Sequence, residues 1–184
     1  MTIGAAPSGS VELSGLLAEP ETPPRALVLA RHGGGMTAAY FHSRAHPDLS
    51  LLRLGHRLGF TVLALDRPGY GRSGTFTPGM RPIASVPELE TYESALWPDL
   101  LPGVAAEVRV PFQFSVAEHE QWWQVTDADL AEYQALFTAA PHLVVRRQPA
   151  AGHNISLGWA ARSYHLNALA FAEQCLLRRR GDLY

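Results

Sequence analysis

The chain has 184 residues and a formal net charge of −2, so nothing in its charge predicts nucleic acid or a membrane as a partner. All 15 basic residues are arginines, which excludes a Schiff-base lysine and a P-loop lysine, and the single cysteine, Cys175, cannot form an internal disulfide. No apolar run approaches the about 18 residues of a membrane span. The arginine bias is typical of a GC-rich genome, so we expect a bacterial protein. The single cysteine and an N-terminus without the features of a signal peptide lead us to expect a cytoplasmic location. We expect no cofactor and no metal.

Two continuous apolar runs, at 26–30 and 60–65, predict the first central strands of a parallel sheet. Strands that are apolar along their whole length are typical of sheets buried on both faces. Asp48 or Ser50 is expected to cap the helix between them, and Gly59 follows that helix as its C′ residue. The glycine-rich loops after both strands lie where open α/β sheets bind ligands.

The middle of the chain, 75–107, predicts an irregular connection or the remnant of a lid, with helical character only near 88–96. It contains five prolines, which break regular elements. The pattern then predicts four further elements: a strand at 108–117, a helix capped by Thr126 or Asp127, a last strand at 142–146 and a final helix at about 161–180.

The first glycine loop is His32-Gly33-Gly34-Gly35. Glycines leave their backbone N–H groups accessible, so a substrate oxygen can approach them. Such donors form an oxyanion hole, in which one N–H contributes roughly 3–4 kcal/mol of transition-state stabilisation. The alternative interpretation is a flexible turn.

The second loop reads Asp66-Arg67-Pro68-Gly69-Tyr70-Gly71-Arg72-Ser73-Gly74, one crossover after the first. Together the two loops resemble those of the α/β-hydrolase superfamily. The resemblance implies that the first loop supplies part of the oxyanion hole. It also implies that the second loop turns the chain and braces the site. Ser73 is not expected to be the nucleophile, because the family's G-x-S-x-G spacing needs a small residue where Thr75 stands.

The resemblance resumes in the second half of the chain. In the run Ala117-Glu118-His119-Glu120, Glu120 takes the position of the family's acid, and Ala150-Ala151-Gly152-His153-Asn154 resembles the loop that carries the catalytic histidine. The resemblance therefore implies that Glu120 orients His153, which serves as the base. The alternative for His153 is a surface-loop histidine. We interpret the neighbouring Trp122 and Trp123 as packing beneath the loop, and the alternative is that they line a pocket.

The family's nucleophile elbow is missing. Between the matched blocks lie only 33 residues, whereas one β-α-β unit takes about 30 and the family needs more than one here. Ser85 and Ser94 are flanked by residues too large for the strained elbow. Ser115 lies in a predicted strand, and Ser156 follows His153 too closely. We therefore do not expect serine hydrolase activity. The pair His42 and His46 lacks acidic partners at ligand spacing, so no metal site is predicted.

The expected fold is a reduced, α/β-hydrolase-like three-layer sandwich. It has a mostly parallel central sheet of about five strands with helices on both faces. We predict one domain over 1–184, with halves at 11–74 and 108–180. The strand at Ala26 is expected to pair directly with the strand at Val108, and the alternative is a gap that another chain fills.

Three functions are compatible with these residues. The first is proton-transfer chemistry on a small carbonyl or ester-type molecule, of the lyase, cyclase or dehydratase kind, without an acyl-enzyme. The second is a non-catalytic scaffold that binds a small ligand or forms a homodimer through an exposed sheet edge. The third is an internally shortened form of an ordinary esterase-like hydrolase.

Overall fold

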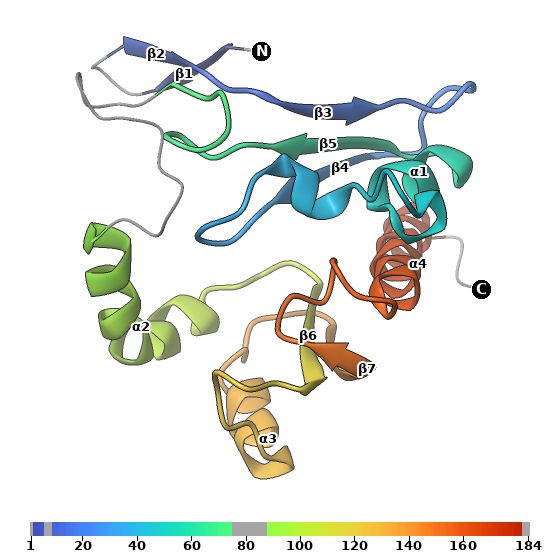
Figure 1. The fold of residues 1–184 in the computed structure, drawn as a ribbon. Coiled ribbons are helices and arrows are strands. Elements are labelled where there is room, and N and C mark those ends of the chain that lie inside the picture. The colour runs from blue at the N-terminus through green and yellow to red at the C-terminus, as the bar shows by residue number, and fades with distance from the viewer. Residues whose placement is uncertain (1, 6–8, 75–87, 182–184) are drawn as a thin grey trace. The chain divides into compact units, whose positions relative to one another are not determined.

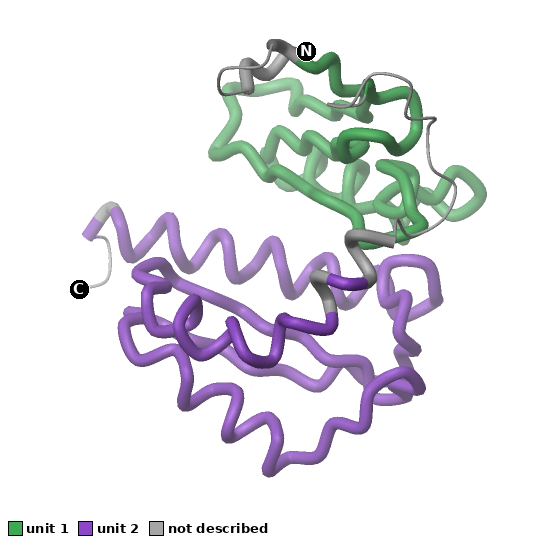
Figure 2. The backbone as a smooth tube through the Cα atoms, turned by 90° about the vertical axis from the view of Figure 1, so that its left-hand side faces the viewer, with its two compact units in different colours: residues 1–91 green, residues 92–184 purple. Residues whose placement is uncertain are grey.

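The computed structural model describes residues 2–5, 9–74 and 88–181 (Figure 1). The predicted connection at 75–87, including Ser85, lies outside the described residues. Backbone contacts divide the chain into two compact units, 1–91 and 92–184 (Figure 2), and each is described by itself. A single domain over 1–184 stays a prediction.

The first unit contains a three-stranded sheet in the order β3-β5-β4. As the apolar runs predict, β4 (Leu27–Arg31) pairs in parallel with β5 (Thr61–Leu65). Antiparallel to β5 lies β3 (Gly15–Ala18). A separate antiparallel pair joins β1 (Thr2–Ala5) to β2 (Gly9–Glu12).

Helices connect β4 to β5 in the first unit: η1 (Ala38–Phe41), η2 (Pro47–Leu49) and α1 (Leu51–Arg57). Ser50 is the N-cap of α1, because its hydroxyl accepts the Arg53 N–H at 3.2 Å. Gly59 follows the helix with φ +82°, a conformation that favours glycine. Both predicted signals of this helix are confirmed.

The two faces of this sheet differ in burial. One face packs against α1 and includes the fully buried Val62 and Ala64. On the other face, Leu17 of β3 and Leu29 of β4 lie on either side of Leu63 in β5. The side chains of Leu17, Leu27 and Leu29 are 55–61% exposed. The prediction that the first strand is buried on both faces is therefore wrong for β4. Among the described strands, β4 lies at the edge of this sheet and pairs only with β5.

The contact between α1 and β5 leaves no room for a side chain at Gly55. A Cβ atom there would lie 2.2 Å from Cγ2 of Val62, whose β-branched side chain is stiff. We expect Gly55→Ala to destabilise the protein by about 1–3 kcal/mol through overpacking, despite alanine's higher helix propensity. Gly103→Ala is the matched control, because open space surrounds Gly103 in its helix. Urea unfolding measures both, and equal effects would contradict the packing argument.

The second unit contains most of α2 (Glu88–Ala106) and two parallel strands. These strands are β6 (Phe112–His119) and β7 (Leu143–Gly152), which pair with each other. The helix is ten residues longer than the expected 88–96, although Pro98 and Pro102 lie inside it. Figure 1 shows that α2 bends along its length, as helices do at internal prolines. The expectation of an irregular segment is therefore wrong over 97–106.

Helices cover both faces of the β6-β7 sheet. On one face, Phe114 stacks on Tyr133 of α3 (Asp127–Ala135), with 4.3 Å between the ring centroids. Phe112 stacks on Phe137, which lies just after α3, at 4.7 Å. On the other face, Gln113 and Ser115 of β6 line a cavity together with residues of α4 (Ala161–Arg180). The bounds of α4 are those predicted from the sequence. Thr126 caps α3 in a capping box, which confirms one of the two predicted caps.

The described strands form three sheets rather than one. Among them, β4 pairs only with β5, and β6 only with β7. The predicted sheet of about five strands, with the Ala26 strand beside the Val108 strand, is thus not seen, although the mixed α/β class is. In the described part of the chain, the interval between β5 and β6 supplies a helix and no strand. No helix in that part is long and apolar enough to cross a membrane.

Candidate functional site

Glu120 and His153 meet because two parallel strands end side by side. The last paired residues are His119 of β6 and Gly152 of β7, and the two candidate residues follow immediately. The carboxyl ends of neighbouring parallel strands lie at one edge of a sheet. The register therefore brings together side chains that are 33 positions apart.

An irregularity in β7 sets this register. From the pair Ala117–Gln148 to the pair His119–Gly152, the register advances by two residues on β6 and by four on β7. Within the extra stretch, Ala150 has φ +54°, which is unusual for a residue with a Cβ atom. Its N–H donates to a carboxylate oxygen of Glu118 at 2.8 Å. Glu118 thus holds the bulge that precedes His153.

The Glu120–His153 contact has the geometry of an acid–histidine pair. Nδ1 of His153 lies 2.9 and 3.0 Å from the two carboxylate oxygens, and the Trp122 N–H donates to Oε1 at 2.9 Å. Burial would raise the pKa of Glu120, but the Trp122 N–H and His153 outweigh it, so that pKa is lowered. The carboxylate is ionised and accepts the Nδ1 proton. Nε2 has no partner among the described residues.

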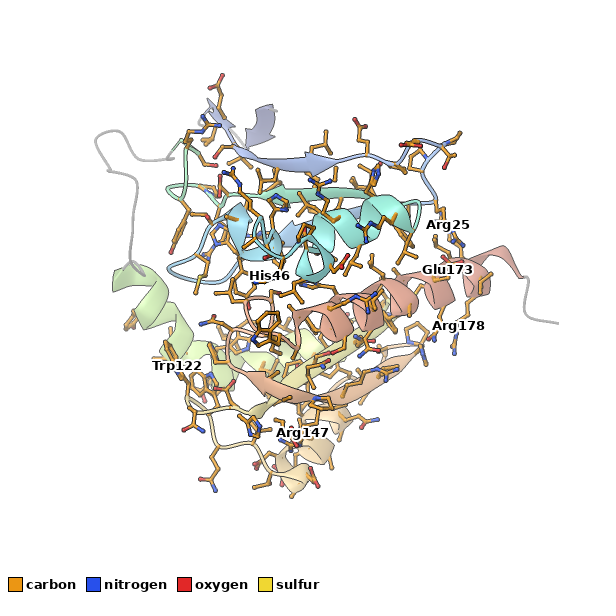
Figure 3. The ribbon with its side chains drawn as sticks, turned by 45° about the vertical axis from the view of Figure 1, so that its right-hand side comes forward. Arg25, His46, Trp122, Arg147, Glu173 and Arg178 are labelled. Carbon is orange, nitrogen blue, oxygen red and sulfur yellow. The ribbon has the colours of Figure 1, made fainter. Side chains whose placement is uncertain are left out.

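Trp122 covers one face of the histidine ring. The two rings are nearly parallel, with 6° between their planes and 4.7 Å between their centroids. Figure 3 labels Trp122 on the loop after β6. Trp122 and Trp123 are 73% and 64% exposed, so the interpretation that they pack beneath the loop is wrong. The His153 side chain remains 36% exposed beside this stack, so it is not closed off from a ligand.

A buried histidine anchors the loop that carries His153. Nε2 of His165, in α4, lies 3.0 Å from the Ser156 hydroxyl, and both residues are buried. Ser156 therefore fastens the loop to the helix. Sequence reasoning missed His165, since a histidine on the apolar side of a helix has no motif. Its position, one turn into α4 and nine residues after Ser156, was the available signal.

The described residues place no nucleophile on His153. Neither a serine hydroxyl nor the thiol forms a hydrogen bond with its ring among those residues. Burial raises the pKa of the Cys175 thiol, and Arg178 only partly opposes this, so the thiol is protonated at neutral pH. Cys175 is therefore not an activated nucleophile.

The glycine loop in the first unit combines a fixed histidine with accessible amides. The Arg67 N–H donates to Nε2 of His32 at 3.1 Å, so Nδ1 carries the proton and donates to the Gly33 carbonyl at 2.7 Å. Both ring nitrogens of this buried residue are engaged, and His32 links the two loops. The N–H groups of Gly33, Gly34 and Gly35 have no partner among the described residues. A Cβ atom at Gly33 or Gly35 would meet open space.

The second loop braces this region, as predicted. Asp66 accepts the Ala38 N–H at 2.7 Å and the Ser14 hydroxyl at 2.5 Å. The Ser73 hydroxyl donates to the Asp66 carbonyl and accepts the Ser14 N–H, both at 2.9 Å. Ser73 is only 3% exposed, and these two hydrogen bonds of its hydroxyl fasten this loop.

No group of three or more metal-ligating side chains is found in the described ranges. In the pair His42 and His46, Nδ1 of His42 lies 2.9 Å from the Ser50 hydroxyl. The glycine loop belongs to the first unit and the Glu120–His153 pair to the second.

The sequence matches no family model and no curated protein. Among solved structures, it is similar to the crystal structure of a predicted CIB-like hydrolase from Thermoplasma acidophilum, with 13% identity and a TM-score of 0.54. The likeness covers 89% of this chain and 99% of that one. At this identity it concerns the fold alone. It supports an α/β-hydrolase-like fold for this chain, the scaffold that the residue motifs predict.

Proposed function

We propose that the protein catalyses proton transfer on a small carbonyl compound, with His153 as the general base. The observation that carries this proposal is the bond from Nδ1 of His153 to the ionised Glu120, which leaves Nε2 without a partner among the described residues. A carboxylate on Nδ1 holds the imidazole in one tautomer and stabilises its protonated form. His153 is therefore suited to take a proton and return it.

The glycine loop would stabilise the negative charge that forms on the substrate. Removal of a proton beside a carbonyl group places charge on its oxygen, and backbone N–H donors aimed at that oxygen lower the barrier. The accessible amides of Gly33, Gly34 and Gly35 support this role. His32, with both ring nitrogens engaged, holds the loop in place. Dehydration, cyclisation or decarboxylation of a small carbonyl compound fits this chemistry when it proceeds through an enolate.

Exchange of α-protons in deuterated water tests the proposal. A panel of small ketones, aldehydes and esters is incubated with the protein, and loss of the α-proton signal is followed by NMR. We expect catalysed exchange in at least one compound. A fluorophosphonate probe should leave the protein unlabelled, because no described serine is activated. Stoichiometric labelling of a serine, or exchange no faster than in buffer across the panel, would contradict the proposal.

A homodimerising scaffold is the second candidate, and the edge strand β4 favours it. Its outer edge is unpaired among the described strands, and its Leu27 and Leu29 are 61% and 55% exposed. An exposed, apolar sheet edge invites pairing with another chain. We expect light scattering after size exclusion to show a dimer that Leu29→Arg converts to a monomer. Leu96→Arg, at an exposed leucine of α2, is the control. A monomeric wild-type protein at all concentrations would contradict this candidate.

A further inference from the structure

A cavity of about 410 Å³ opens in the first unit between β3, η1 and the 66–74 loop. Three basic side chains line it: His42, Arg44 and Arg72. Among the described residues that line it, Asp66 alone is acidic. The cavity lies wholly within residues 14–72, so its walls come from one compact unit.

The charges around this cavity do not cancel. The Asp66 carboxylate is buried and already accepts hydrogen bonds from the Ala38 N–H and the Ser14 hydroxyl. Arg44 and Arg72 are exposed, and neither forms an ion pair with another described residue. Two uncompensated guanidinium groups therefore face the same space, and guanidinium groups match the geometry of carboxylates and phosphates.

Ser50 holds His42 through the Nδ1 side of its ring. The Ser50 hydroxyl accepts the Arg53 N–H and lies 2.9 Å from Nδ1 of His42. When this hydroxyl donates its own proton to Nδ1, the neutral ring carries its proton on Nε2. Burial lowers the pKa of His42, and the positive charges of Arg53 and Arg44 lower it further. The local field is therefore one that an anion would relieve.

We propose that this cavity binds a compact anion with a carboxylate or phosphate group. The guanidinium groups of Arg44 and Arg72 neutralise its charge, and Nε2–H of His42 donates a hydrogen bond to it. This inference does not depend on the proposed proton transfer, because it uses none of the residues assigned to that reaction.

NMR of the histidine rings tests the proposal on the whole protein. Inorganic phosphate and sodium acetate are titrated separately, and sodium chloride at the same ionic strength measures screening alone. We expect a saturable shift of the His42 signals with phosphate, acetate or both. At saturation the pKa of His42 should rise, because a bound anion favours the imidazolium. His42 also lines a second, neighbouring cavity. The same titration therefore follows the other titratable groups of the two cavities besides the arginines, which are Asp66, Glu19 and His56.

Variants separate specific binding from general charge. Arg44→Gln and Arg72→Gln should each weaken binding by about fivefold or more, because each removes one charge partner. Arg57→Gln is the matched control, since Arg57 is exposed in the same unit but does not line the cavity. Saturation by phosphate alone or by acetate alone identifies the anion. An unshifted His42, the same shift with chloride, or equal binding by all three variants would overturn the proposal.

Discussion

His153→Ala is expected to lower catalysed α-proton exchange by roughly 10²–10⁴-fold, the usual contribution of a positioned general base. Nε2 of His153 is the proposed basic atom, because Glu120 holds the ring through Nδ1. Among the described residues, no other histidine bonds to the Glu120 carboxylate. Loss of the ring therefore removes the base without removing the glycine amides. The rate is measured by NMR in deuterated water on the best compound of the panel.

His119→Ala is the matched control for this substitution. His119 directly precedes Glu120, and its side chain is 67% exposed. We expect the control to exchange protons at the wild-type rate, because its ring contacts neither Glu120 nor His153 among the described contacts. Equal losses in both variants, or full activity in His153→Ala, would exclude His153 as the base.

Glu120→Gln tests the orientation of the same base. Glutamine keeps the size of the side chain but not its charge, so its amide can turn its nitrogen to Nδ1 and favour the wrong tautomer. A fall of up to about 10⁴-fold is expected, as for other acid–histidine pairs. Because its pKa is lowered, the Glu120 carboxylate stays ionised down to pH values below its ordinary pKa. Loss of activity between pH 5 and 7 should therefore not follow protonation of Glu120.

Local signals in the sequence predicted the helix ends well. Ser50 and Thr126 cap their helices because a hydroxyl at that point satisfies a free N–H group, and this needs no tertiary information. The bounds of α4 follow from its apolar spacing for the same reason. The length of α2 could not be predicted in this way. Prolines usually end helices, and only the structure shows that α2 bends at them and continues.

The exposure of β4 shows a different limit. An apolar run predicts a strand, but whether both of its faces are covered depends on neighbours elsewhere in the chain. The family's chain order led to the expectation that Glu120 contacts His153, and the structure shows that contact; their catalytic roles stay a prediction. The Trp122 stack and the His165 anchor depend on the bulge in β7 and on the placement of α4, which no local pattern contains.

Asp66→Ala is expected to destabilise the first unit by roughly 2–4 kcal/mol. The carboxylate joins the start of β3 to η1, so its removal leaves the buried Ala38 N–H without a partner and frees the Ser14 hydroxyl. Gly71 also lies against this carboxylate, and truncation would leave a void there. Asp48→Ala is the matched control. Asp48 forms a surface ion pair with Arg57, of the kind worth about 0–1 kcal/mol.

The position of the tryptophans makes this measurement specific to each unit. All four tryptophans lie within 92–184, so their fluorescence reports on the second unit, whereas amide exchange in β5 reports on the first. If the units unfold separately, Asp66→Ala lowers the free energy of exchange in β5 and leaves the fluorescence transition in urea unchanged. If 1–184 is a single cooperative domain, both measurements fall together. A loss in β5 no larger than that of Asp48→Ala would show that Asp66 does not brace the loop.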